Sequence, residues 1–96
     1  MSDFELIDNG DGRFALKGDM SFRTADRILK ASESVFGKYP SLHVDMSGVA
    51  KADSAGLALL LEWKAQASQS NAEIHYEAVP DSLAAIAITS EVSDLL

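Results

Sequence analysis

Hydrophobic and polar residues alternate along four short stretches of the chain, and between these stretches the apolar residues recur at helical spacing. Alternation predicts a strand with one buried face, whereas intervals of three and four residues predict an amphipathic helix. Strands are expected at residues 4–7, 13–17, 41–46 and 73–79. Helices are expected at residues 24–38, 54–70 and 82–89. The order β-β-α-β-α-β-α predicts an α/β fold, a mixed sheet of about four strands packed against about three to four helices.

Turn-forming residues mark the ends of several expected elements. The segment Asn9-Gly10-Asp11-Gly12 tolerates positive φ and predicts a tight turn that joins the first two strands into a hairpin. Gly18 is expected to end the second strand. Thr24 is expected to cap the first helix, and Gly37 is expected to stop it.

The second expected helix carries apolar residues on two faces. The residues expected to face the core are Leu57, Leu60, Leu61 and Ala65. A different face carries Leu59, Trp63 and Gln66. An exposed leucine and tryptophan there would suit a protein contact, because aromatic residues dominate binding hot spots. The alternative is that Trp63 packs at the edge of the domain against the chain end.

Composition narrows the function classes. The chain has 96 residues, the size of one domain, and no cysteine, which excludes disulfides, thiolate metal sites and cysteine nucleophiles. The net charge of −7 does not favour nucleic-acid binding, because contact with phosphates needs a basic surface. The apolar run at residues 57–61 is far below the ~20 residues that span a bilayer. Acidic residues through the first two strands are unlike a signal peptide, so we expect a soluble cytoplasmic protein.

One serine stands at a position where a side chain can be presented to a partner. Ser54 follows Asp53 at the start of the second expected helix, and the small residues Ala55 and Gly56 leave the backbone accessible. Either Ser54 caps the helix, or Asp53 caps it and Ser54 is the first helical residue. A helix amino terminus tolerates a phosphate on Ser54, although Asp53 and Asp45 would repel one. The residues permit a phosphorylation switch without requiring it.

No assembled catalytic set is evident in the sequence. The histidines, His43 and His75, lie in expected strands, and neither has a recognisable triad spacing with Ser54. No glycine-rich phosphate loop and no metal-ligand spacing occur. We therefore expect a protein without enzymatic activity, cofactor or metal.

The segment from Val44 to Leu61 resembles the signature of STAS domains, found in bacterial anti-sigma factor antagonists and sulfate-transporter tails. That signature is a hydrophobic strand with D-L-S-x-V, then x-x-D-[ST]-[ASG]-G-L and an apolar helix. The matching residues are Asp45, Ser47, Val49, Asp53, Ser54, Gly56 and Leu57. The step Gly18-Asp19-Met20 is similar to the family's G-[ED]-[LM]. The resemblance implies a STAS fold over residues 1–96.

Among STAS domains, the chain length and residues 53–61 most resemble the MlaB-like subunits of ABC phospholipid transporters that maintain outer-membrane lipid asymmetry. The resemblance implies a non-enzymatic subunit that binds and regulates an MlaF-like ATPase. Such a subunit is cytoplasmic and reaches the inner membrane only through its partner. The residues expected at the partner contact are Ser54, Asp53, Ala55, Gly56, Leu59 and Trp63.

The alternative is an anti-sigma factor antagonist, released from an anti-sigma factor kinase when Ser54 is phosphorylated. Two departures weaken this interpretation. Antagonists carry an aspartate where this chain has Ser21, and often a second serine or threonine where it has Ala55.

Overall fold

The computed structural model describes residues 3–96 and shows four strands and three helices over that range. The strands are β1 (Phe4–Asp8), β2 (Arg13–Met20), β3 (Ser41–Ala52) and β4 (Glu73–Glu77). The helices are α1 (Ala25–Glu33), α2 (Ser54–Gln69) and α3 (Asp81–Thr89). Short 3-10 turns, η1 (Phe36–Lys38) and η2 (Ser93–Leu95), follow α1 and α3. The expected order of elements is confirmed.

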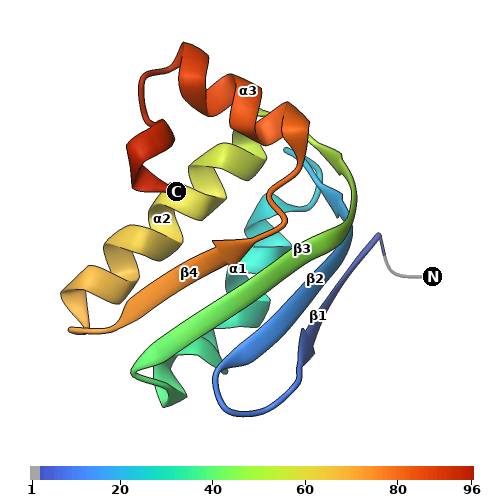
Figure 1. The fold of residues 1–96 in the computed structure, drawn as a ribbon. Helices are drawn as coiled ribbons and strands as arrows, with labels where there is room; N and C mark the ends of the chain where they lie inside the picture. Colours follow the sequence, from blue (N-terminus) through green and yellow to red (C-terminus); the bar gives the residue numbers. More distant parts are fainter. Residues whose placement is uncertain (1–2) are drawn as a thin grey trace.

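The four strands form one mixed sheet in the order β1-β2-β3-β4. The first two form an antiparallel hairpin, and β2, β3 and β4 run parallel because α1 and α2 connect them. Both helices lie on the same face of the sheet, and α3 packs against the start of α2 (Figure 1). Within residues 3–96, no helix is both long and apolar enough to cross a membrane.

The core lies between the sheet and the helices. Alternate strand residues face it, which confirms the alternation expected for half-buried strands. The strand residues buried there include Phe14, Leu16, Leu42, Val44, Met46 and Ile74. The helices cover them with Ile28, Leu57, Leu60, Trp63 and Leu83. The opposite face of the sheet is mostly polar, and the paired residues Ile7 and Ala15 are exceptions.

The strands β2 and β3 run well past their predicted ends, to Met20 and Ala52. Gly18 does not end β2, which pairs with β3 as far as the match of Met20 with Ala52. Instead, Gly18 has a φ of +93°, and a Cβ there would lie 2.5 Å from the Asp3 carbonyl oxygen. It therefore permits an irregularity within the strand pair. The extended β3 brings the chain to the start of α2 beside the end of β2.

The first helix is shorter than predicted and is not capped by Thr24. The Thr24 hydroxyl donates to the Asp19 carbonyl at 2.9 Å and accepts from the Ser21 N–H, so it braces the loop before α1. The helix ends at Glu33 rather than continuing to residue 38. The separate turn η1 then places the Phe36 ring 4.8 Å from that of Phe14. Packing of this aromatic ring, not helix propensity, sets the path of the chain here.

Candidate functional site

Asp53 organises the amino terminus of α2. It is extended, with φ −143° and ψ −167°, and its Oδ1 accepts from the N–H groups of Ala55 at 2.9 Å and Gly56 at 3.4 Å. Of the two alternatives left open by the sequence, Asp53 is therefore the cap and Ser54 is the first helical residue. The second oxygen, Oδ2, accepts from the Phe22 N–H at 3.1 Å. One carboxylate thus joins the start of α2 to the loop between β2 and α1.

Replacing Asp53 with alanine should lower the free energy of unfolding by about 1–2 kcal/mol, because the cap is lost and the Phe22 loop is released. Asparagine is the matched control, since it caps helices about as well as aspartate but has only one acceptor oxygen. Urea denaturation of both variants measures the difference. We expect the asparagine variant to lose less stability, and equal losses in the two variants would contradict the capping role.

Ser54 presents its side chain to solvent. The residue is exposed, and its hydroxyl has no intramolecular hydrogen-bond partner within the part of the chain that the structure describes. Its hydroxyl is therefore free to bond with another molecule. The adjacent α2 N–H groups are already occupied by Asp53, so a phosphate on Ser54 would meet a carboxylate at this helix end.

The expectation that Gly56 leaves the backbone accessible to a partner is wrong. The residue is buried, and a Cβ there would lie 2.6 Å from the Met20 carbonyl oxygen and 3.6 Å from the Leu83 side chain. Its missing side chain lets α2 pass close to the end of β2 and to α3. Ala55 is half-buried beside it.

The expectation that Leu59 and Trp63 lie on an exposed face of α2 is also wrong. The exposed fraction of Leu59 is 4% and that of Trp63 is 1%. The indole N–H of Trp63 donates to the Ser32 hydroxyl of α1 at 2.9 Å, and its ring lies 5.0 Å from that of Phe36. Trp63 therefore packs under α1 and η1. Conversely, Ala65 is exposed rather than buried.

Leu59 and Trp63 are buried because α2 is covered on more than one side. This helix contacts α1 on one side and α3 on another, in addition to the sheet beneath it. Several of its faces are therefore covered, and a single core stripe does not describe it. The burial of Leu59 and Trp63 removes the physical ground for assigning them to a partner contact.

A residue that sequence reasoning missed contacts Asp53. The Phe22 side chain is 79% exposed, and its backbone N–H is held by the same Asp53 carboxylate that caps α2. The signal in the sequence was weak: a lone phenylalanine between Ser21 and Arg23, outside any periodic pattern. We call Phe22, Asp53 and Ser54 the Ser54 surface.

The two histidines do not serve as a base for Ser54. His43 and His75 are register partners on β3 and β4, with stacked rings whose centroids lie 5.1 Å apart. His43 lies near the start of β3, whereas Ser54 follows the end of that strand. Across residues 3–96 there is no group of three or more histidine, cysteine or acidic residues arranged to hold a metal ion.

Several solved structures have a similar arrangement of strands and helices. The phosphorylated form of SpoIIAA, a Bacillus cell fate determinant, has a TM-score of 0.71 at 14% identity, over 96% of this chain and 86% of that one. An anti-sigma factor antagonist from Mycobacterium paratuberculosis also scores 0.71, at 17% identity, over 95% and 79%. Mglu scores 0.61 at 19% identity, and the match spans 80% of this chain but only 19% of Mglu. At these identities the likeness shows the fold alone.

A comparison with curated proteins found no match. The sequence pattern of the family described as "Mlab, STAS domain" matches residues 7–96. The four-stranded mixed sheet with three helices is the α/β STAS fold shared with SpoIIAA. Because the family pattern matches nearly the whole chain, the chain belongs to the Mlab family of STAS domains.

Proposed function

We propose that this chain is a non-enzymatic subunit that docks on the ATPase of an ABC phospholipid transporter and regulates it through the Ser54 surface. The observation that carries the proposal is that the Asp53 carboxylate ties the loop of Phe22, whose side chain is exposed, to the start of α2, where Ser54 is also exposed. Family membership supports the class of partner. The chain would work in the cytoplasm and reach the inner membrane through the transporter.

The physical argument concerns the exposed ring of Phe22. A phenylalanine in water gains free energy when a partner covers it, and aromatic side chains are enriched among binding hot spots. The hydrogen bond from its backbone N–H to Asp53 restrains the loop before binding, so less ordering is needed at the contact. Ser54 then adds a hydroxyl that a partner can reach. Asp53 contributes by holding the backbone of the Phe22 loop against the start of α2.

Phe22→Ala should weaken binding to the ATPase subunit about 30-fold, the effect of losing a 2 kcal/mol hot spot. Ser54→Glu should also weaken it, because it places bulk and charge in the contact, whereas Ser54→Thr should bind like the parent. Titration calorimetry with the ATPase subunit of the same transporter measures each affinity. Melting temperatures should stay near the parental value, since both side chains are exposed.

Ile88→Ala is the matched control, because Ile88 is another large apolar side chain on the surface, 67% exposed on α3. We expect it to retain most of the affinity. If Phe22→Ala and Ser54→Glu bind the ATPase with parental affinity, the Ser54 surface is not the contact.

The second candidate is an anti-sigma factor antagonist that a partner kinase phosphorylates at Ser54. The exposed hydroxyl at the start of α2 favours it, and the nearby Asp53 carboxylate opposes it. Incubation with an anti-sigma factor kinase and ATP, followed by mass spectrometry, separates the candidates. Phosphate on Ser54 together with no affinity for the transporter ATPase would favour the antagonist.

A further inference from the structure

Beyond β4, the sheet that residues 3–96 form has no further strand. β4 is the last strand in the order, and it pairs with β3 in parallel. The Glu73 N–H donates to the carbonyl of Pro40, the residue before β3, at 3.0 Å, so the backbone groups of Glu73 face β3. The backbone groups of successive residues in a strand point to opposite sides. Those of Ile74 and Tyr76 therefore point to the free edge.

Lys64 reaches this edge from α2. Its Nζ donates to the Ile74 carbonyl at 2.7 Å and lies 5.3 Å from the centre of the Tyr76 ring. Hydrogen bonds of this length from a charged donor are among the stronger ones in proteins. Lys64 is half-buried, and the exposed fraction of Ile74 is 3%. The lysine thus covers the acceptor that a further strand would need at Ile74.

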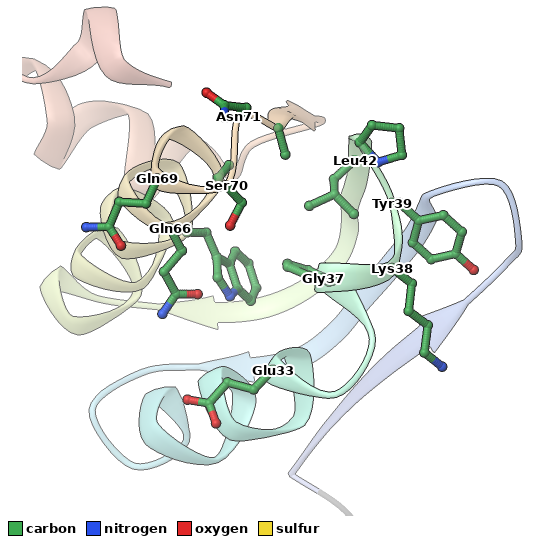
Figure 2. Close-up of a pocket in the computed structure, with 14 residues that line it drawn as sticks. Glu33, Gly37, Lys38, Tyr39, Leu42, Gln66, Gln69, Ser70 and Asn71 are labelled. Atoms are coloured by element: carbon green, nitrogen blue, oxygen red, sulfur yellow. The ribbon is translucent and has the colours of Figure 1, made fainter.

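The turn between α2 and β4 brings the edge within reach of Lys64. Asn71 has a φ of +57°, a conformation typical of tight turns. Figure 2 shows Ser70 and Asn71 at this turn, where the chain leaves α2 for β4. The strand then returns along the helix, and the Tyr76 hydroxyl donates to the Leu60 carbonyl at 2.6 Å. Because Leu60 lies one turn before Lys64, this second bond fixes the helix over the edge.

We propose that the free edge of β4 is a strand-pairing surface for a second copy of this chain, and that Lys64 holds it closed. Unpaired backbone groups on an edge strand are a template for another strand, and lysine is one of the residues that block such edges. The edge is complementary to itself when two copies meet antiparallel about His75. Ile74 of each copy then bonds with Tyr76 of the other. This pairing requires the Lys64 ammonium to leave the Ile74 carbonyl.

Charges on the outer face of β4 also oppose the pairing. In the antiparallel arrangement, Glu73 of one copy lies opposite Glu77 of the other, and like charges directly opposite destabilise a strand pair. Both glutamates are exposed, so salt screens their repulsion. Lys64 is half-buried and bonded to the backbone, and salt weakens that contact much less. At high salt, Lys64 is therefore the main block to association.

Removing the Lys64 side chain should open the edge. We expect Lys64→Ala to dimerise at least about ten-fold more tightly than the parent at high salt, because each parental copy must first break a charge-assisted hydrogen bond. Sedimentation equilibrium measures both dissociation constants. Lys64→Arg keeps a charged donor and should stay close to the parent. If melting curves show that Lys64→Ala does not fold, Lys64→Gln replaces it, since glutamine is neutral and too short to reach the carbonyl.

Lys30→Ala is the matched control, because it removes an exposed lysine from another helix, α1, and changes the net charge equally. It should associate like the parent. Dimerisation of the Lys64 variant that is no tighter than that of Lys30→Ala would overturn the proposal.

A single cysteine locates the pairing, because the sequence has none of its own. In the antiparallel arrangement the two copies of residue 75 form a non-hydrogen-bonded pair with Cα atoms about 4.5 Å apart, within disulfide reach. His75→Cys in the Lys64→Ala background should therefore form an intermolecular disulfide under mild oxidation. His43→Cys in the same background is its control, since His43 is the register partner of His75 one strand inward, and it should cross-link far more slowly. Equal rates for the two would place the association elsewhere and contradict the assignment.

Discussion

Replacing Trp63 with alanine should lower the free energy of unfolding by roughly 3–5 kcal/mol, the usual range for deleting a fully buried tryptophan. The indole fills the space between α2, α1 and η1, and no solvent reaches it, with 1% of its surface exposed. Its ring contacts that of Phe36 and lies 6.4 Å from that of Tyr76. Urea denaturation of the parent and the variant measures the loss. A loss below about 1 kcal/mol would contradict the packing described for this residue.

The hydrogen bond of Trp63 can be measured separately from its bulk. Ser32→Ala leaves the buried indole N–H without its partner, which should cost about 1–3 kcal/mol. The same substitution made in a Trp63→Phe background should cost less, because that background has no indole N–H to leave unpaired. The double-mutant cycle isolates the contact between α1 and α2. Emission of the parent should already be shifted to the blue, and it should change little when a partner covers the Ser54 surface.

Gly56→Ala should destabilise the domain by about 1–3 kcal/mol, although alanine ordinarily favours a helix over glycine. The added Cβ would lie 2.6 Å from the Met20 carbonyl oxygen, which is backbone at the end of β2 and has little freedom to move. Either α2 shifts away from the sheet or the last pairing of β2 with β3 is disturbed. The sign of the effect is therefore opposite to the one that helix propensity alone predicts.

Gly37→Ala is the matched control for Gly56→Ala. A Cβ at Gly37 meets no atom within 4 Å, and the residue is exposed. We expect its effect to stay within about 0.5 kcal/mol, the usual range for a surface substitution. Thermal melting and urea denaturation of the two variants compare the same chemical change in two surroundings. If Gly56→Ala proves as stable as Gly37→Ala, the close passage of α2 over β2 is not a constraint.

Local patterns in the sequence were sufficient to predict the strands and helices and their order. Alternation requires only that one strand face is buried, and the turn at residues 9–12 requires only residues that tolerate positive φ. The cap of α2 is equally local, because Asp53 reaches N–H groups two and three residues ahead of it. For that reason the sequence placed Ser54 at the start of a helix before any tertiary contact was known.

Contacts between distant segments decided the length of β2, the buried faces of α2 and the place of Phe22, because no local sequence pattern records such contacts. Pairing with β3 carried β2 past Gly18, and cover by α1 and α3 buried Leu59 and Trp63 on a face that periodicity assigned to solvent. Phe22 became part of the Ser54 surface only because the folded chain brings its N–H to Asp53. Periodicity reports which residues are apolar and how they are spaced along one element. Which face is covered depends on neighbours that the fold supplies.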